Sequence, residues 1–214
     1  MAELEVKITE TVMEACSRAS SVMKCLLSSS LLACIWRPES NDVSPIIDHL
    51  SWSDEAYCRD KKLWYALGKL KSATAAWRIA REKDLRLATI CSALPTGSGF
   101  HKLNVTATFG YLKGVNEMFW RGMLATVEVK KLADAHVSVY EAKTAHGRYV
   151  CYDSILQERD EVEGLVRDIG MPRGRLCRDT IVYCPRARLS NSKLSALTRQ
   201  RDHRCVVKRP FGLR

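Results

Sequence analysis

The stretch Lys24-Cys25-Leu26-Leu27-Ser28-Ser29-Ser30-Leu31-Leu32-Ala33-Cys34-Ile35-Trp36 is the strongest indicator of the fold class. It is apolar on both sides of its serines, which is typical of a buried strand in a parallel sheet. A second buried strand is predicted over 85–94. Between the two lies 60–83, which contains no Pro and a single Gly and favours a long helix. This order of strand, helix and strand predicts an α/β fold with a parallel sheet.

The remaining segments continue the alternation of helix and strand. Apolar residues spaced near 3.6 predict an amphipathic helix over 4–19. Residues 37–60, rich in Pro, Asp and Ser, are predicted to form a long loop, and 95–99 a turn. Residues 100–123 are expected to be irregular. Further along the chain we expect a short strand over 125–129, a helix over 132–142, a strand over 149–152 and a helix over 158–169.

The composition limits the class of protein. The chain has 214 residues, of which 46% are hydrophobic and 27% charged, so it is neither disordered nor a disulfide-rich miniprotein. No apolar run approaches the ~18 residues of a membrane span, and Glu3, Glu5 and Glu10 do not fit a secretory signal. Nine Cys with no CxxC pair suggest reduced thiols in the cytoplasm and no structural metal.

The positive charge is concentrated near the C-terminus. Residues 173–214 carry a surplus of ten positive charges, which equals the net charge of +10 of the whole chain. A basic segment of this kind can bind nucleic acid. Tyr183 and Phe211 are its only aromatic residues, and no RNA-binding signature accompanies them, so we do not expect a nucleic-acid partner. Residues 198–214 are predicted to form a basic, disordered tail.

Tyr65 and Lys69 form the pair with the clearest chemical meaning. They lie four residues apart on the predicted helix, so their side chains share one face. A phenol has a pKa near 10, and bringing it to about 7 requires roughly 4 kcal/mol of preferential stabilisation of the phenolate. A nearby ammonium supplies energy of that order. The alternative is an exposed lysine one turn from a packed tyrosine, and the spacing alone leaves both open.

The serines of the first strand are the second candidate feature. A hydroxyl at the end of a strand can hydrogen-bond a substrate carbonyl, and a buried serine needs a partner. The alternative is hydrogen bonding to nearby backbone. His136 follows Asp134 on a predicted amphipathic helix, and we interpret it as a structural histidine.

Several ordered blocks of the sequence carry a resemblance to a known family. Residues 26–34 resemble the strand that bears the catalytic serine in extended short-chain dehydrogenase/reductases. The segment Trp52-Ser53-Asp54-Glu55, the Tyr65–Lys69 helix and Leu94-Pro95-Thr96-Gly97 resemble the blocks that follow in plant cinnamoyl-CoA reductases and dihydroflavonol reductases. The match continues in Tyr111-Leu112-Lys113-Gly114, Leu132-Ala133-Asp134-Ala135-His136 and Gly147-Arg148-Tyr149.

The resemblance implies a Rossmann-like, doubly wound parallel sheet and an NADP-dependent reduction of a small aromatic, phenylpropanoid-type carbonyl or thioester. By resemblance, Tyr65 donates the proton, Lys69 lowers the pKa of Tyr65, and Ser30 orients the carbonyl, with Ser29 as the alternative. The cofactor contacts it implies are Tyr65, Lys69, Leu94, Pro95 and Thr96. The choice of NADP over NAD rests on the resemblance alone.

The chain also departs from the family. Leu63, Ala66 and Leu67 replace residues of the usual NWYCYGK motif, which leaves the substrate open. The family's first strands and Gly-rich pyrophosphate turn have no counterpart, so we expect a sheet that lacks them. The expected organisation is half of a Rossmann domain over 1–99 and a small substrate lobe, interleaved with the last Rossmann elements, over 100–197. The alternative function is a catalytically inactive paralogue that cannot bind the dinucleotide.

Overall fold

The computed structural model describes residues 2–38, 46–97, 105–169 and 187–207. Its centre is a parallel sheet of three strands in the order β1-β3-β6, formed by Cys25–Ser30, Leu87–Ser92 and Gly147–Cys151. Cys25 pairs with Leu87, and Ser30 pairs with Ser92. On the other side of β3, Ser92 pairs with Cys151. Because the strands are parallel and in this register, all of them end at the same edge of the sheet.

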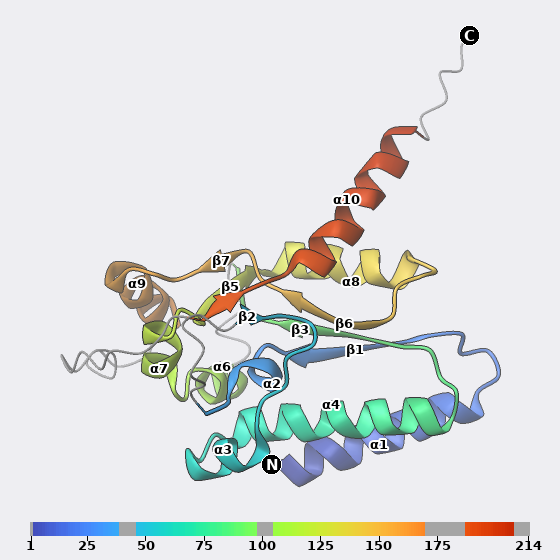
Figure 1. Ribbon diagram of the computed structural model, residues 1–214, viewed down its shortest axis with the longest axis horizontal. Coiled ribbons are helices and arrows are strands. Elements are labelled where there is room, and N and C mark those ends of the chain that lie inside the picture. Colours follow the sequence, from blue (N-terminus) through green and yellow to red (C-terminus); the bar gives the residue numbers. More distant parts are fainter. Residues whose placement is uncertain (1, 39–45, 98–104, 170–186, 208–214) are drawn as a thin grey trace.

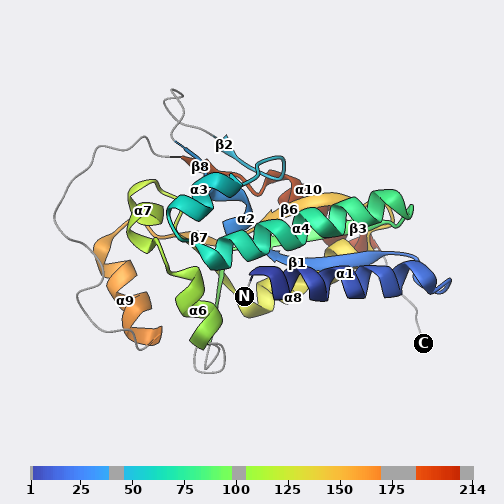
Figure 2. The ribbon, with the colours of Figure 1, turned by 90° about the horizontal axis from the view of Figure 1, so that it is seen from below.

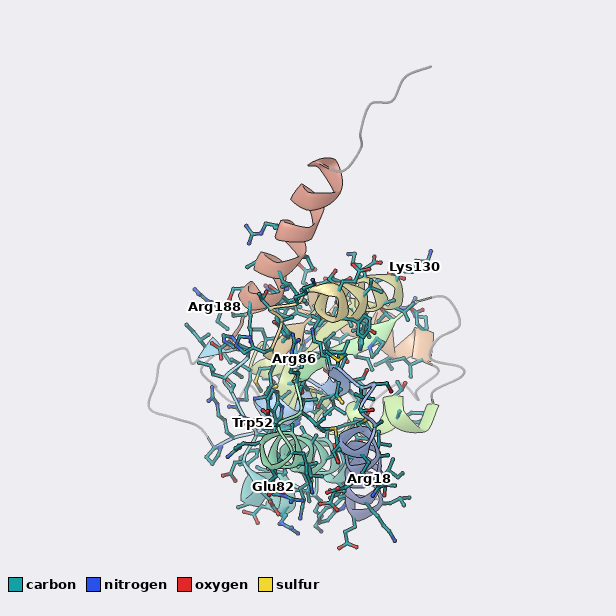
Figure 3. The ribbon with its side chains drawn as sticks, turned by 90° about the vertical axis from the view of Figure 1, so that its right-hand side faces the viewer. Arg18, Trp52, Glu82, Arg86, Lys130 and Arg188 are labelled. Atoms are coloured by element: carbon teal, nitrogen blue, oxygen red, sulfur yellow. The ribbon has the colours of Figure 1, made fainter. Side chains whose placement is uncertain are left out.

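Helices cover both faces of this sheet. Helices α1 (Ala2–Arg18) and α4 (Trp64–Glu82) lie side by side below it, and α8 (Val129–Glu141) lies above it, next to α10 (Ser192–Val207) (Figures 1 and 2). Figure 3 shows the same layers from the side, with Arg18 and Glu82 in the lower layer and Lys130 in the upper one. The arrangement is an α/β fold with a parallel sheet, as the alternating pattern predicts.

Smaller elements extend this core at the carboxyl end of the sheet. Strands β4 (Leu94–Thr96) and β5 (Ala125–Glu128) pair in parallel, and β7 (Ser154–Ile155) pairs antiparallel to β5. Strands β2 (Ile46–Ile47) and β8 (Arg188–Leu189) form a second short parallel pair. Short helices complete this part of the fold: α2 (Leu32–Ile35), α3 (Glu55–Asp60), α6 (Val105–Tyr111), α7 (Val115–Trp120) and α9 (Arg159–Ile169).

Gly68 allows α1 to pack closely against the N-terminal half of α4, which carries Tyr65 and Lys69. A Cβ atom on Gly68 would lie 3.4 Å from the Cα of Ala2 and 2.5 Å from the Oε2 atom of Glu5. Glycine at this position therefore lets the first turn of α1 pack directly against α4, although glycine inside a helix costs about 1 kcal/mol relative to alanine. The contact brings the carboxylate of Glu5 next to the second turn of α4.

The structure corrects the expected strand over 24–36. The strand ends at Ser30, and Leu32–Ile35 forms a helical turn. The hydroxyl of Ser30 accepts a hydrogen bond from the amide of Leu32 at 3.2 Å, and the amide of Cys34 donates to the carbonyl of Leu31 at 2.8 Å. A serine hydroxyl that competes for backbone groups in this way favours turns, which explains the early end of the strand.

Three further segments are helical where the sequence predicted loop, irregular structure or disorder. Residues 105–120 form α6 and α7, with Gly114 in a left-handed conformation (φ +88°) between them. Helix α3 lies within the predicted loop 37–60, where the carboxylate of Asp54 caps it by accepting from the amide of Tyr57 at 2.7 Å. Residues 198–207, predicted as disordered, continue helix α10, because the segment contains no Pro or Gly to end it. The predicted turn over 95–99 is wrong at its start, because Pro95 and Thr96 belong to β4 and pair with β5. Residues 98–99, like residues 208–214 of the predicted tail, lie outside the described residues.

Within the described residues, no helix is both long enough and apolar enough to cross a membrane.

Candidate functional site

A cavity of about 200 Å³ opens at the carboxyl end of the central sheet. Its wall combines the end of β1, the first turns of α4, the residues that follow β3, and helix α6. It contains most of the residues that the sequence singled out, but Thr96 is not among its lining residues. The wall is formed by Ser28, Ser29, Ser30, Tyr65, Lys69, Ser92, Ala93, Leu94, Pro95, Ala107, Thr108 and Tyr111.

Tyr65 and Lys69 lie one turn apart on the face of α4 that borders the cavity. The Nζ atom of Lys69 is 5.4 Å from the centroid of the Tyr65 ring. The same ammonium forms an ion pair with the carboxylate of Glu5 on α1. Lys69 therefore has a negative partner from a helix that precedes it by more than sixty residues in the sequence.

The pKa of Tyr65 is raised rather than lowered. Burial is the largest cause, the ammonium of Lys69 lowers the pKa, and the carboxylate of Glu5 raises it again. The sequence predicted that Lys69 lowers the pKa of Tyr65. The interaction with Lys69 does act in that direction, but the net shift is upward. Desolvation of the phenolate outweighs that interaction, because a buried phenol is easier to keep neutral than charged.

The three serines of β1 have different environments. Ser28 is exposed and shares a hydrogen bond of 2.8 Å with the Nε2 atom of His136 on α8. Ser29 is buried, and its hydroxyl has no hydrogen-bond partner among the described residues. Ser30 is buried and accepts from the amide of Leu32, which leaves its own hydroxyl hydrogen able to donate.

Helix α6 closes the cavity over the tyrosine. A Cβ atom on Gly110 would lie 3.1 Å from the Cγ atom of Tyr65, so the backbone of α6 packs closely against the ring. Tyr111 is buried and lines the cavity, and burial raises its pKa. Among the described aromatic residues of 105–123, Tyr111 is the one that lines this cavity. Phe119, and with it the apolar side chain of Met118, is buried in the core instead.

The cavity fits one end of a dinucleotide better than the whole. Hydroxyl groups, one of them the unpartnered hydroxyl of Ser29, and the ammonium of Lys69 suit a hydroxylated ribose and a carboxamide ring. A volume of about 200 Å³ is small beside the ~300–1,000 Å³ of sites for larger ligands. The described residues contain no strand–Gly-rich turn–helix unit of the kind that binds a pyrophosphate.

The sequence did not point to two neighbours of this site. Glu5 reaches Lys69 only because α1 packs against α4, and His136 reaches Ser28 only because α8 packs against β1. No sequence pattern detects these pairs, because Glu5 and Lys69 are more than sixty residues apart and Ser28 and His136 are 108 residues apart. Among the described residues, no group of three or more His, Cys, Asp or Glu side chains is placed to hold a metal ion.

Known structures share this arrangement of helices and strands. The crystal structure of vestitone reductase from alfalfa (Medicago sativa) superimposes with a TM-score of 0.62 at 17% identity, over 92% of this chain and 65% of that one. Yeast methylglyoxal/isovaleraldehyde reductase, solved with NADPH, gives a TM-score of 0.64 at 18% identity, over 90% of this chain and 64% of that one. The fold is therefore that of the NAD(P)-binding, Rossmann-like reductases.

Sequence comparison identifies the family within that class. Cinnamoyl-CoA reductase 1 of Petunia hybrida is 33% identical over 204 residues, which span 92% of this chain and 60% of the relative. Tetraketide alpha-pyrone reductase 1 of Arabidopsis thaliana is 29% identical over 161 residues, 73% of this chain and 49% of the relative. No protein-family model matches the chain. The chain belongs to the extended short-chain dehydrogenase/reductases, in the group of the cinnamoyl-CoA and dihydroflavonol reductases, and it spans about 60% of the length of the first of these relatives.

Proposed function

We propose that this chain carries the substrate side of an NADPH-dependent reductase site that acts on a small aromatic carbonyl compound or CoA thioester of the phenylpropanoid type. The observation that carries the proposal is the single cavity lined by Ser30, Tyr65 and Lys69 together with Leu94 and Pro95. Three separate elements, β1, α4 and β4, contribute these residues, so the family relationship and the geometry point to the same side chains.

In this proposal each residue has a distinct role. The phenol of Tyr65, which is neutral because burial raises its pKa, donates a proton to the substrate oxygen. The free hydroxyl hydrogen of Ser30 holds that oxygen in place, and Lys69 stabilises the phenolate left on Tyr65. The bound cofactor supplies the hydride, while the protein supplies orientation and electrostatics.

The finer features of the proposal rest on the named relatives. Relatives named as cinnamoyl-CoA and tetraketide alpha-pyrone reductases support an aromatic or polyketide-type substrate. We further propose a Rossmann-like domain over 1–99 that lacks the first strands of the doubly wound sheet, with a substrate lobe over 100–197. We also propose Leu94, Pro95 and Thr96 as cofactor contacts. Leu94 and Pro95 line the cavity, whereas Thr96 does not.

The test is a fluorescence titration of the purified chain with NADPH. Saturable binding that is lost in the double variant Tyr65→Phe/Lys69→Ala supports the proposal. The double variant Tyr149→Phe/Lys193→Ala is a matched control, because this second lysine also stands over a tyrosine ring (4.4 Å to its centroid) but lies outside the cavity wall. Absence of binding by a chain that circular dichroism shows to be folded would contradict the proposal.

One observation favours a second function, that of a paralogue that does not catalyse reduction. Glu5 engages the ammonium of Lys69 and raises the pKa of Tyr65, which opposes the proposed stabilisation of the phenolate by Lys69 and makes the phenol a weaker acid. If the ion pair is what prevents binding, the variant Glu5→Gln gains NADPH binding that the unaltered chain lacks. If neither chain binds NADPH, the missing contacts lie elsewhere and the non-catalytic function is favoured.

A further inference from the structure

Ser28 and His136 form a hydrogen-bonded chain whose direction the geometry determines. The Nδ1 atom of His136 lies 2.8 Å from the carbonyl oxygen of Leu132, and its Nε2 atom lies 2.8 Å from the hydroxyl of Ser28. A carbonyl oxygen can only accept, so Nδ1 carries the hydrogen in the neutral ring. Nε2 is then the unprotonated nitrogen, and the hydroxyl of Ser28 donates to it.

A hydrogen bond from the serine hydroxyl to a histidine nitrogen is the arrangement found in activated serine nucleophiles. In such sites a serine hydroxyl donates to a histidine nitrogen, and a third group on the opposite ring nitrogen orients the imidazole. Here the carbonyl of Leu132, one turn earlier on α8, fixes the ring. Ser28 is exposed and lines the cavity, so its oxygen is open to a ligand there.

The edge of the sheet supplies hydrogen-bond donors beside this serine. Within the described residues β1 pairs with β3 alone, so its other side is open. The amides of Cys25 and Leu31 donate toward β3, to Arg86 and Ser92. Amides alternate in direction along a strand, so those of Ser28 and Ser30 face the open edge. Amides on alternate residues of a strand are about 6.6 Å apart and parallel, so one of them at a time can donate to a developing oxyanion.

We propose that Ser28 and His136 form an acyl-transfer site that hydrolyses activated aromatic esters or thioesters without a cofactor. The oxygen of Ser28 forms a bond to the acyl carbon while its proton moves to Nε2 of His136. The bond from the acyl carbon to the leaving oxygen or sulfur then breaks, and the leaving group takes that proton. Water attacks the resulting acyl-serine with His136 again accepting a proton, which returns to Ser28 as the carboxylic acid leaves.

The cavity defines the substrate class. Tyr111, Leu94 and Pro95 give one side of the cavity an apolar wall, and a volume of about 200 Å³ suits one aromatic ring with a short acyl chain. The proposal does not depend on the reductase function, because hydrolysis requires neither NADPH nor the proton of Tyr65.

The experiment measures hydrolysis of 4-nitrophenyl cinnamate by the full chain in the absence of NADPH. We expect a burst of nitrophenol and a cinnamoyl group on the peptide that contains Ser28, identified by mass spectrometry. Ser28→Ala and His136→Gln are expected to abolish the burst and to lower the steady rate by at least about tenfold. His146→Gln is the matched control, since its Nδ1 atom also lies near a backbone carbonyl, that of Thr144 at 2.9 Å, and no serine partner is found for it among the described residues.

Two results overturn the proposal. One is a rate in Ser28→Ala equal to that of the unaltered chain; the other is acylation at a residue other than Ser28. Should Ser28→Ala not fold, the site of acylation in the unaltered chain decides alone. A folded chain that binds NADPH but gives no burst would overturn this site and leave the reductase proposal intact.

Discussion

Arg148 has an unusual environment for a charged side chain. It is 5% exposed, and among the described residues it forms no ion pair with a carboxylate. Its guanidinium lies 3.6 Å from the centroid of the Trp52 ring, and it donates to the carbonyl of Ser51 at 2.6 Å and to the sulfur of Cys34 at 2.8 Å. The sulfur of Cys91 is 3.7 Å away. A buried cation is stabilised by a negative partner, and of the two thiols that contact the guanidinium, Cys91 is the one whose pKa is lowered, whereas the pKa of Cys34 is raised.

The pH dependence of stability should reveal the thiolate of Cys91. The hydrogen bond from Cys34, assisted by the charge of Arg148, lowers the pKa of Cys91 from 9.0 to about 7. A lowered pKa contributes stability that is fully present above the unfolded value of 9.0 and is lost as the pH falls through about 7. Cys91→Ala should therefore reduce the free energy of unfolding more at about pH 8 than at about pH 6. Urea titrations of both chains in reducing buffer measure this difference, and a constant difference would contradict the assignment.

At the scale of elements, the turn at Gly114 connects α7 to helix α6, which lines the cavity. Gly114 adopts φ +88°, and a Cβ atom there would lie 2.7 Å from the Cη2 atom of Trp36, a fully buried ring. Neither the backbone nor the ring can move easily, because Trp36 is fully buried in the main hydrophobic core. The turn therefore depends on glycine for both its conformation and its space.

Gly114→Ala should destabilise the fold by about 3 kcal/mol, the combined cost of the left-handed conformation and of overpacking. Gly164→Ala is the matched control, because it lies in α9 with no atom within 4 Å of its added Cβ. That variant should instead gain up to about 1 kcal/mol from helix propensity. Urea unfolding of the unaltered chain, Gly114→Ala and Gly164→Ala measures the three free energies of unfolding. An equal change in both variants would show that the conformation of Gly114 and its contact with Trp36 do not determine the stability at this position.

At the scale of the whole molecule, the open side of β1 is the feature with the largest consequence. Within the described residues this strand has one neighbour, although its first half, Cys25-Leu26-Leu27, is apolar. An unpaired, apolar edge is a template for pairing with another chain. We therefore expect the isolated chain to associate with itself through the apolar half of this edge at Leu26, ahead of Ser28.

The variant Leu26→Pro tests the association directly. The amide of Leu26 faces the open edge by the same alternation that applies to Ser28, so proline removes an external donor and leaves the ladder to β3 intact. Leu26→Ala is the control, because it loses the same side-chain packing but keeps the amide. Sedimentation at increasing concentration should show association in the unaltered chain and in Leu26→Ala, and less in Leu26→Pro. Equal association of the two variants would place the contact elsewhere.

The sequence by itself determined the central fold and the identity of the proposed reactive side chains. Apolar runs and helical spacing are local properties, so they predicted β1, β3, β6, α1, α4 and α8, and the four-residue spacing placed Tyr65 and Lys69 on one face. Local patterns misjudged residues 31–36, where a serine hydroxyl ends the strand, and 105–120, where short helices depend on packing against the core. Only the tertiary structure brought Glu5 to Lys69 and His136 to Ser28. Those contacts join residues far apart in the chain. The first forms because α1 packs against α4, and the second because α8 packs against β1, and no spacing in the sequence records either packing.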